Sequence, residues 1–362
     1  MENLVTLQSL ASHYRNKKVF LTGNTGFKGS WMMACLHLLG AKIKGYALAP
    51  AYREGLFELL EPSGIAETVI ADIRDKDRLQ KEIISFQPDY VFHMAAQALV
   101  RRSYKIPAET FDINVTGTAI LLEAISRLEN ACATVVITTD KVYENRETNV
   151  LYNEGDRLGG HDPYSASKAC AEFVVSSFRN SLFQHSSHVG LKALASARAG
   201  NVIGGGDWAE DRIIPDIIRS LQNNQPVGIR NPASIRPWQH VLEPLAGYLL
   251  LGAMAKQNPR AYGKAFNFGP YPDDHLSVRE LAEIAIQSWG SGSWKDVSDQ
   301  KQPHEAAILQ LSIEQAIKEL NWVPRLRAKQ AVEWSIQWYR QAPSGRSDYT
   351  FRQIKEYFQH DF

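Results

Sequence analysis

The feature that most constrains the fold of this chain is a regular alternation of short apolar runs with helical stretches as far as residue 196. The apolar runs are rich in β-branched and aromatic residues, as buried strands are. We therefore expect strands at 17–22, 42–48, 68–71, 90–94, 133–139 and 190–196. Because strands that alternate with helices pair in parallel through right-handed crossovers, the pattern predicts an α/β fold with a doubly wound parallel sheet.

Helices are expected between these strands, at 30–39, 76–86, 106–128 and 162–183. The stretch 106–128 is expected to be one long helix, with Pro107 in its first turn. Beyond residue 196 the regular alternation stops, and residues 198–208 are glycine-rich and typical of a loop. Further helices are expected at 213–223, 278–289 and 313–320, strands at 226–230, 235–240 and 265–268, and a packed tail at 344–362.

The turn between the first strand and the first helix has the layout of a dinucleotide-phosphate site. Its glycines follow a G-x-x-G-x-x-G pattern, which lets a backbone approach a pyrophosphate, and the helix after it offers free N–H groups and a positive dipole end. The residues expected to contact a cofactor here are Gly23, Thr25, Gly26, Phe27 and Gly29. The pattern alone is weak, since a tight strand-to-helix turn without a ligand has the same form.

The predicted strand ends bring further candidates to the same edge of the sheet, where ligands of doubly wound folds bind. Asp72, Ile73, Ala95 and Ala96 follow the third and fourth strands and are expected to contact the cofactor. Asp72 is expected either to contact the adenine end of the cofactor or to be the N-cap of the next helix. No acid follows the second strand at 47–50, although NAD sites usually place one there, and Arg53 could instead meet the 2′-phosphate of NADP.

These elements predict two unequal parts. Residues 1–197, with returning segments near 235–265, are expected to form a Rossmann-type, NAD-binding domain. Residues 198–362 are expected to form mainly a smaller α/β lobe that binds the substrate. No internal repeat or low-complexity tract is visible.

Charge and cysteine content exclude several classes of protein. Lys and Arg number 40 and Asp and Glu 39, so neither a nucleic-acid partner nor a membrane surface is indicated. Cys35, Cys132 and Cys170 are too few and too scattered for a disulfide framework. The most lipophilic stretch, 245–255, is too short to span a bilayer, and the first residues do not resemble a signal peptide. We expect a cytoplasmic protein.

Two further sites place ionisable groups near the fifth strand. Thr139, Asp140 and Lys141 come where this strand ends, and Tyr164 and Lys168 lie four residues apart, on one face of a helix. A phenol titrates near 10, but a nearby ammonium and the charge of an oxidised nicotinamide both favour its phenolate. The set is suited to taking a proton from an alcohol while hydride leaves, although a Tyr and a Lys that only pack would look the same.

No metal site is expected, because the histidines lack partners at ligand spacing. His93, His185 and His188 are interpreted as structural or surface residues.

The glycine turn, the Tyr164–Lys168 pair and the strand order resemble the extended short-chain dehydrogenase/reductase family over nearly the whole chain. Within it, residues 139–143 resemble the nucleotide-sugar 4,6-dehydratases, in which two ionisable residues follow the Thr. Residues 140–145, 198–208 with 211–216, and 236–245 are similar to the branch that acts on CDP-glucose.

The resemblance implies a lyase that converts CDP-D-glucose to CDP-4-keto-6-deoxy-D-glucose and water, on the way to deoxysugars of surface polysaccharide such as lipopolysaccharide O-antigen. It implies NAD as cofactor, transient oxidation at C4, elimination across C5 and C6, and hydride return to C6. Tyr164 would take the C4 hydroxyl proton, and Asp140 would help the C6 hydroxyl leave. Thr139 and Lys168 would support Tyr164.

Lys141 departs from dTDP-glucose relatives, which carry a Glu as the C5 base. A lysine must be neutral to accept a proton, and its unperturbed pKa is about 10.4. Lys141 is therefore expected to be a base of depressed pKa, a cation that stabilises the C5 enolate, or a member of a structural ion pair.

The resemblance also implies residues that hold the nucleotide diphosphate, and an assembly. Asn201, Arg212, Arg236 and His240 are expected to contact the substrate. A homodimer is expected through helices 106–128 and 162–183, and a tetramer is possible by the same logic. The alternatives are a nucleotide-sugar 4-epimerase or reductase of the same fold, and a non-catalytic dinucleotide sensor.

Overall fold

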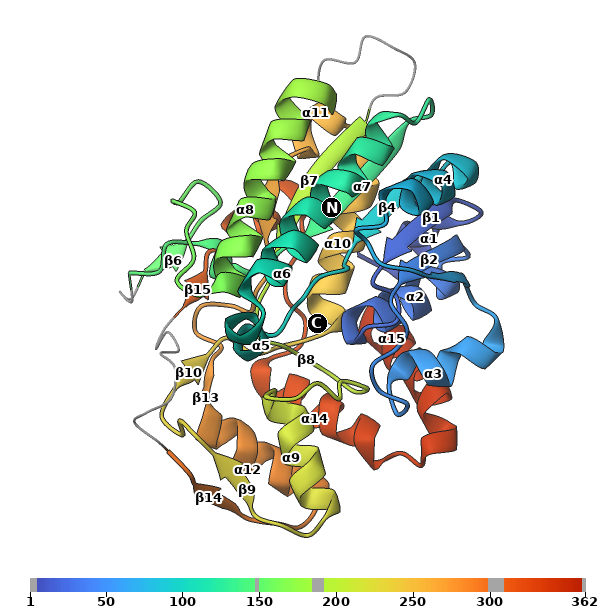
Figure 1. The fold of residues 1–362 in the computed structure, drawn as a ribbon. Coiled ribbons are helices and arrows are strands. Elements are labelled where there is room, and N and C mark those ends of the chain that lie inside the picture. Colours follow the sequence, from blue (N-terminus) through green and yellow to red (C-terminus); the bar gives the residue numbers. More distant parts are fainter. Residues whose placement is uncertain (1–4, 147–149, 184–191, 299–308, 360–362) are drawn as a thin grey trace.

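A seven-stranded parallel sheet forms the centre of the computed structural model, which describes residues 5–146, 150–183, 192–298 and 309–359 (Figure 1). The strand order is β12-β7-β5-β4-β1-β2-β3, so its direction of winding reverses between β1 and β4. The strands are β1 Lys18–Thr22, β2 Lys42–Ala47, β3 Glu67–Ile70, β4 Tyr90–His93, β5 Cys132–Ile137, β7 Lys192–Arg198 and β12 Ala265–Asn267. The predicted doubly wound parallel sheet is confirmed.

Side chains of each central strand point alternately into two separate cores. In β1, Val19 and Leu21 belong to one apolar cluster and Phe20 to the other. In β5, Val135 and Val136 divide in the same way. Burial of both faces explains why these strands read as continuous apolar runs in the sequence rather than as alternating ones.

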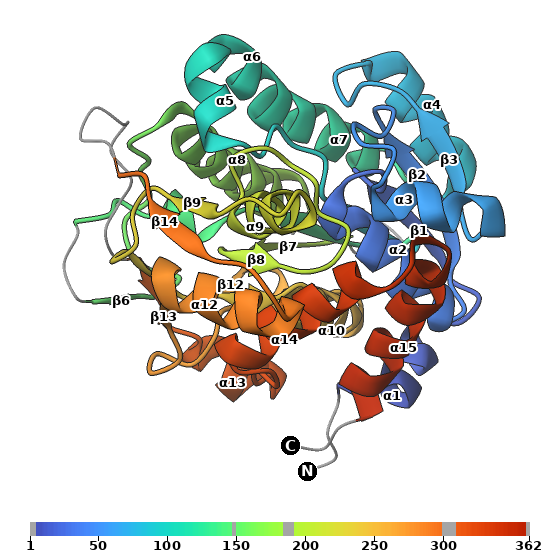
Figure 2. The same cartoon turned by 90° about the horizontal axis from the view of Figure 1, so that it is seen from below.

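Helices cover both faces of the sheet, as Figures 1 and 2 show. One face carries α4 Lys76–Phe86, α7 Gly117–Ser126 and α8 Pro163–Phe178. The other carries α1 Leu7–Tyr14, α2 Phe27–Leu38, α10 Leu242–Gln257 and α15 Arg346–Gln359, with α3 Leu56–Leu60 beside α2 and α15. The expected C-terminal tail is thus the packed helix α15.

The expected single helix at 106–128 is interrupted. It consists of α6 Pro107–Phe111, a π-helical turn η2 Asp112–Thr116, and α7. Asn114 in this turn points inward, accepts from Gln97 N at 2.9 Å and donates to Ser167 Oγ at 2.8 Å. The extra residue per turn places this amide against α8, which a regular helix would not do. Helix α8 likewise continues into a π-helical turn, η4 Arg179–Phe183.

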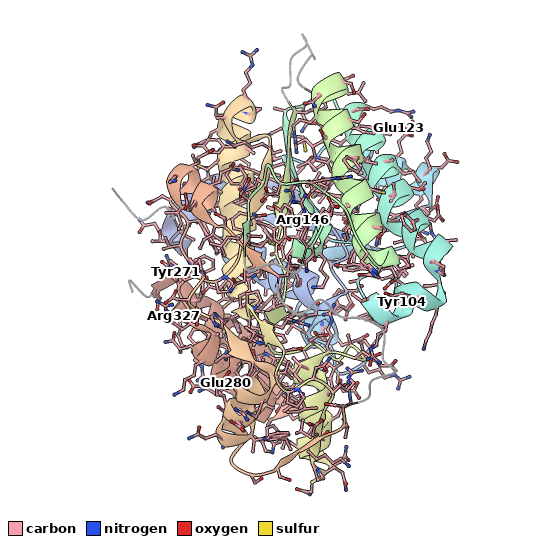
Figure 3. All side chains as sticks on the ribbon, turned by 90° about the vertical axis from the view of Figure 1, so that its left-hand side faces the viewer. Tyr104, Glu123, Arg146, Tyr271, Glu280 and Arg327 are labelled. Carbon is pink, nitrogen blue, oxygen red and sulfur yellow. The ribbon has the colours of Figure 1, made fainter. Side chains whose placement is uncertain are left out.

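A second layer of elements extends beyond the carboxyl edge of the sheet. Its helices are α9 Ile213–Gln222, α12 Val278–Trp289 and α14 Ala328–Arg340, which pack on one another. Two-stranded sheets pair β9 Val227–Ile229 with β14 Trp294–Asp296, and β10 Ile235–Arg236 with β13 Leu276–Ser277. On its surface Arg327 stacks on Tyr271 at 5.0 Å from the ring centre (Figure 3).

Smaller elements complete the chain. They are η1 Glu61–Ser63, α5 Val100–Lys105, η3 Asp140–Val142, β6 Leu151–Tyr152, β8 Val202–Ile203, β11 Gln239–His240, α11 Pro259–Tyr262, β15 Gln310–Leu311, α13 Glu314–Leu320 and η5 Pro343–Gly345. The strand expected at 235–240 is divided into β10 and β11, because Pro237 between them has no N–H to donate. Residues 190 and 191 of another expected strand, and His185 and His188, lie outside the described residues.

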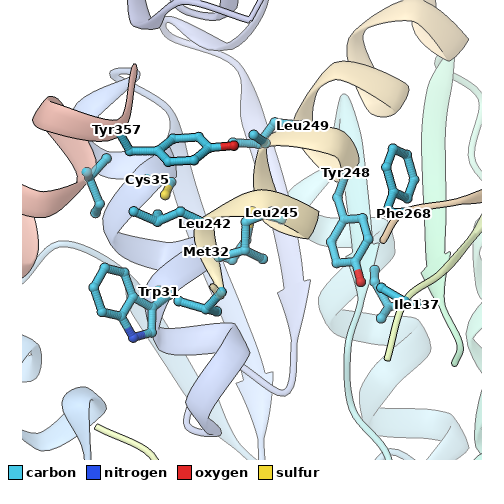
Figure 4. Packing of buried hydrophobic residues seen from close by; sticks show 14 of the residues in the cluster. Trp31, Met32, Cys35, Ile137, Leu242, Leu245, Tyr248, Leu249, Phe268 and Tyr357 are labelled. Carbon is cyan, nitrogen blue, oxygen red and sulfur yellow. The ribbon is translucent and has the colours of Figure 1, made fainter. Parts of the chain in front are cut away.

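The most apolar stretch of the sequence lies inside α10, which is buried nearly all round (Figure 4). Leu242, Leu245 and Leu249 pack in one cluster with Trp31 and Met32 of α2. Among the described residues no helix has both the length and the apolar character needed to cross a membrane.

Three passages of the chain between the sheet and the second layer lie side by side. Phe268 N donates to Arg198 O at 2.8 Å, and Gln239 N donates to Asn201 O at 3.2 Å. The Gln239 side-chain amide donates to both Gly200 O and Phe268 O at 3.0 Å. One buried amide therefore fastens all three passages.

Candidate active site

A cavity of about 1210 Å³ lies between the carboxyl edge of the sheet and the second layer. One side, here called the catalytic wall, consists of Thr138–Lys141 after β5 and the first turn of α8. The opposite side, the substrate wall, consists of cavity-lining residues within the stretches 199–216 and 228–238. Ligands of doubly wound folds bind at this edge, so the cavity is where the sequence places the reaction.

Gly26 of the glycine turn is the N-cap of α2 and has no side chain that could accept a hydrogen bond. The first N–H groups of the helix are therefore free to bind a ligand. Gly23 has φ +75°, and a Cβ there would lie 2.7 Å from Ala95 N. A Cβ on Gly29 would lie 2.1 Å from Gly23 O. Both positions therefore need glycine, and the open helix end fits the diphosphate of a dinucleotide. Thr25 donates from its hydroxyl to Leu48 O at 2.9 Å.

The other residues expected at the cofactor lie at neighbouring strand ends. The Asp72 carboxylate pairs with Arg74 at 2.7 Å, and the hydrogen bonds from Arg74 lower its pKa. Ile73 is buried against α7, and Ala95 and Ala96 are half-buried beyond β4. Asp72 is therefore not the N-cap of α4, a position that Asp75 occupies.

Thr139, Asp140 and Lys141 lie together at the carboxyl end of β5. Thr139 begins the short helix η3, and its hydroxyl donates to Asp140 Oδ1 at 2.8 Å. Asp140 is 1% exposed, and a Cβ on Gly200 would overlap its carboxylate. Lys141 Nζ lies 3.4 Å from Asp140 Oδ1, with 37% of its side chain exposed to the cavity. The acid is thus held rigidly while the lysine can reach a ligand.

Tyr164 and Lys168 occupy the face of α8 that meets the end of β5. Lys168 donates to Ile137 O at 3.0 Å, and Tyr164 interacts with the Thr139 hydroxyl. Burial raises the pKa of Tyr164 to about 12, and the Thr139 hydrogen bond opposes this shift. Burial lowers the pKa of Lys168 to about 8, against the attraction of Glu172. The structure therefore places both side chains on one helix beside the end of β5, as their spacing predicts.

A buried ion pair lies behind the catalytic wall. Glu172, one turn beyond Lys168, accepts from Thr138 Oγ1 at 2.6 Å and from Ser196 Oγ at 2.7 Å, and pairs with Arg198 at 3.0 Å. Although burial alone would raise it, these partners hold the pKa of Glu172 below its usual value. The network joins α8, β5 and β7, and so fixes Tyr164 relative to Thr139.

Three of the four residues expected to contact the substrate line the cavity. Asn201, at φ 52°, donates from its amide to Asp140 Oδ2 at 3.4 Å. Arg212 donates to Asp207 at 2.8 Å, and this carboxylate raises the pKa of Arg212. Arg236 lies on β10 at the rim. The substrate wall therefore combines an amide beside the acid with guanidinium groups farther out.

The expectation for His240 is corrected. Its ring is fully buried between Trp31 and Trp334, at 5.7 Å from each ring centre, and it does not line the cavity. Burial lowers its pKa to about 3, so the ring is neutral. Its position four residues after Arg236 did not indicate this, because Gln239 and His240 enter the core as β11.

Sequence reasoning missed Lys28, Tyr52 and Arg230, which also line the cavity. Lys28 occupies one of the variable positions of the G-x-x-G-x-x-G pattern, which makes no demand on the side chain there. Arg230 pairs with Asp211 at 2.7 Å, and no motif in the sequence links these two residues. Among the described residues, no three His, Cys, Asp or Glu side chains are grouped to hold a metal ion.

Comparisons with known proteins identify the family of this chain. The family described as GDP-mannose 4,6 dehydratase matches residues 20–334. A relative from Salmonella typhimurium, described as CDP-glucose 4,6-dehydratase, is 46% identical over 331 residues, or 90% of this chain and 91% of the relative. A dTDP-glucose 4,6-dehydratase from Streptomyces antibioticus is 28% identical over 89% of this chain and 92% of its own.

Solved structures share the fold. DesIV from Streptomyces venezuelae, a dTDP-glucose 4,6-dehydratase with NAD and TYD bound, superposes with a TM-score of 0.75 at 24% identity, over 89% of this chain and 97% of its own. The epimerase Mth375 from Methanothermobacter thermautotrophicus gives 0.78 at 22% identity, over 98% of each chain. The family match and the 46% identical relative together show that this chain belongs to the GDP-mannose 4,6 dehydratase family of nucleotide-sugar dehydratases.

Proposed function

We propose that this protein is an NAD-dependent lyase that converts CDP-D-glucose to CDP-4-keto-6-deoxy-D-glucose and water. The observation that carries the proposal is the buried Asp140, held by Thr139 and Asn201 beside Lys141, in the same cavity as Tyr164. Oxidation alone needs Tyr164 and Lys168. An acid and a second ionisable group at the same site are what an elimination requires in addition.

The residues of the glycine turn fit NAD. The close approach at Gly23 and Gly29 and the uncapped start of α2 suit a pyrophosphate, and Lys168 suits a ribose hydroxyl. Bound there, the nicotinamide supplies reversible hydride acceptance. Neither an acid nor a guanidinium lies at the end of β2 itself, so we infer retention through the phosphates and Asp72 rather than through that strand end.

Tyr164 is the base for the first proton. Its phenol is buried and interacts with Thr139, so a sugar hydroxyl placed between them can pass its proton to the phenolate. Because burial raises the pKa of Tyr164, the phenolate needs nearby positive charge, which Lys168 and an oxidised nicotinamide supply. The Glu172–Arg198 pair keeps α8 in position for this transfer.

Asp140 and Lys141 then serve the loss of water. Asp140 gives a proton to the departing C6 hydroxyl, and its position is fixed by hydrogen bonds from Thr139 and Asn201. Lys141, which is more exposed, faces the carbon whose proton is lost, either as the base or as a cation that stabilises the enolate.

Measuring C5 proton exchange with solvent in Lys141→Ala and Lys141→Glu separates these roles. If Lys141 is the base, C5 proton exchange is expected to be lost in Lys141→Ala and partly retained in Lys141→Glu. A stabilising cation predicts loss in both, and a structural ion pair predicts unchanged exchange in both, which would remove Lys141 from the mechanism.

The choice of cytosine as the base of the nucleotide sugar is inferred from the 46% identical relative. The test is incubation with CDP-glucose that carries deuterium at C4, in ordinary water. A 4-keto product with deuterium at C6 and solvent hydrogen at C5 supports the proposal. An epimer without a keto product would instead favour an epimerase, and no turnover of CDP-, dTDP- or GDP-sugars would favour a dinucleotide sensor.

We further propose a homodimer that works in the cytoplasm, in deoxysugar synthesis for surface polysaccharide. Support comes from apolar side chains on the outer face of α8 and η4, where Phe173 is 58% and Leu182 50% exposed. We also propose that residues 1–197 with α10 and β12 hold the cofactor, and that the second layer selects the substrate. Phe173→Glu is expected to give monomers in sedimentation, and an unchanged mass would contradict this interface.

A further inference from the structure

Lys28 lies in the first turn of α2, directly after the glycine turn, and its side chain reaches the cavity. Its Nζ donates to the Tyr248 hydroxyl at 3.2 Å and lies 5.3 Å from the centre of that ring. Tyr248 belongs to α10, and its hydroxyl points toward Ile137 at the end of β5 (Figure 4). The ammonium group therefore lies where the cofactor turn meets the catalytic wall.

The groups that face Lys28 leave its charge poorly compensated. Lys168 of α8 and Arg212 of the substrate wall repel it, and the Asp140 carboxylate attracts it. Tyr248 contributes a neutral hydroxyl, and the described residues place no carboxylate within ion-pairing distance of its nitrogen. Burial, with Lys168 and Arg212, lowers the pKa of Lys28 to about 7. A half-buried amine that lines the cavity, with a neutral hydroxyl as its hydrogen-bond partner and two cations nearby, is suited to an anion that arrives from outside.

We propose that Lys28 binds a diphosphate group at the junction of the glycine turn and the sugar cavity, and takes up one proton from solvent when it does so. The inference rests on the proposed function, because a dinucleotide and a nucleotide sugar both carry this group. An anion beside the amine favours the ammonium form, so the proton bound from buffer stays on Nζ while the ligand is bound.

The test is titration calorimetry of the whole protein at pH 8, in two buffers of different ionisation enthalpy. NAD and CDP are titrated separately, so the two sources of the diphosphate are distinguished. The wild type is expected to take up about one proton with the ligand that meets Lys28. Lys28→Met is expected to lose this uptake and to bind about 10- to 100-fold more weakly. Lys42→Met, at the exposed start of β2, is the matched control.

Two further variants give signatures that a purely structural role would not. Lys28→Arg keeps a permanent charge, so it is expected to keep binding while proton uptake disappears. Tyr248→Phe removes the hydroxyl that accepts from the ammonium, so it is expected to increase proton uptake at pH 7.

If Lys28→Met loses proton uptake only when CDP is titrated, the site belongs to the nucleotide sugar. If it loses proton uptake only when NAD is titrated, the site belongs to the cofactor. Wild-type affinity and wild-type uptake in Lys28→Met with both ligands would overturn the inference while leaving turnover, measured separately, intact. A wild type that binds both ligands without proton uptake would also overturn it. A wild type that neither binds nor turns over would overturn the proposed function and this inference together.

Discussion

Behind the catalytic wall, Glu172 and Arg198 form an ion pair in which each side chain is 4% exposed, whereas on the substrate wall Arg212 is 34% exposed opposite Asp207. The first pair is surrounded by hydroxyl donors and joins three elements of the sheet layer. The second borders the cavity, and under the proposed function Arg212 is expected to meet a phosphate of the substrate. The proposed function assigns the rigid, buried side to the reacting atoms and the more exposed cations to the substrate, and this difference in burial is what the following variants test.

The largest effect is expected on the catalytic wall. Tyr164→Phe removes the proton acceptor and leaves the packing of α8 nearly unchanged, so kcat is expected to fall by about 10³-fold. Steady-state turnover of CDP-glucose measures this, and NAD binding by calorimetry is expected to remain. Turnover within threefold of wild type would show that another group takes the C4 proton.

Glu172→Gln tests whether the buried pair holds the wall together. Leaving Arg198 without its partner is expected to lower the free energy of unfolding by about 3 kcal/mol, measured by denaturant titration. Glu314→Gln, which breaks an exposed pair with Lys318, is the control and is expected to change it by less than about 0.5 kcal/mol.

The same variant has a pH signature. Because its partners lower the pKa of folded Glu172, the stability it contributes is present above its unfolded pKa and is lost as pH falls through the folded value. The acid side of the wild-type stability profile is therefore expected to be steeper than that of Glu172→Gln. Equal slopes would mean that Glu172 is not charged in the folded state.

On the substrate wall, the effect is expected in KM. Arg212→Met removes a cavity guanidinium, so KM for CDP-glucose is expected to rise about 10- to 30-fold with kcat changed less than threefold. Steady-state kinetics at constant ionic strength measure both constants. A fall in kcat with unchanged KM would place Arg212 among the catalytic groups and remove the contrast between the walls.

The smallest effect is expected at the rim. Arg236→Met is expected to raise KM about threefold, because an exposed charge is screened by salt. The rise is expected to shrink at high ionic strength, whereas the effect of Arg212→Met should persist. An effect equal to that of Arg212 would show that the cavity closes over Arg236 when substrate binds.

What the sequence revealed depended on how local the signal was. The glycine turn and the Tyr164–Lys168 pair are set by spacing within one turn and one helix, so they were predicted. The burial of His240 depends on Trp31 and Trp334, which lie far from it along the chain, and spacing carried no sign of them. The π-helical turn at Asn114 likewise depends on Gln97 and Ser167.

Lys28 is a residue that the sequence analysis did not single out, and the reason is again a contact with a residue distant in sequence. It lies at a variable position of the glycine pattern, and no residue near it in the sequence indicates what its amino group contacts. Its importance comes from Tyr248, which is 220 residues away along the chain. The positions of the central strands and the parallel, doubly wound sheet could be predicted because every strand carried its own apolar run, but contacts between side chains of distant elements could not.

The three chain passages tied by Gln239 have a mechanical consequence. Two layers that are connected by a single chain passage can rotate relative to each other about it. Three chain passages that are hydrogen-bonded to one another resist such a rotation. Rotation of the second layer would have to break the bonds from Gln239 to Gly200 and Phe268 together. The second layer is therefore expected to keep its orientation relative to the sheet when a ligand enters the cavity, so that side chains rather than whole layers adjust to the ligand.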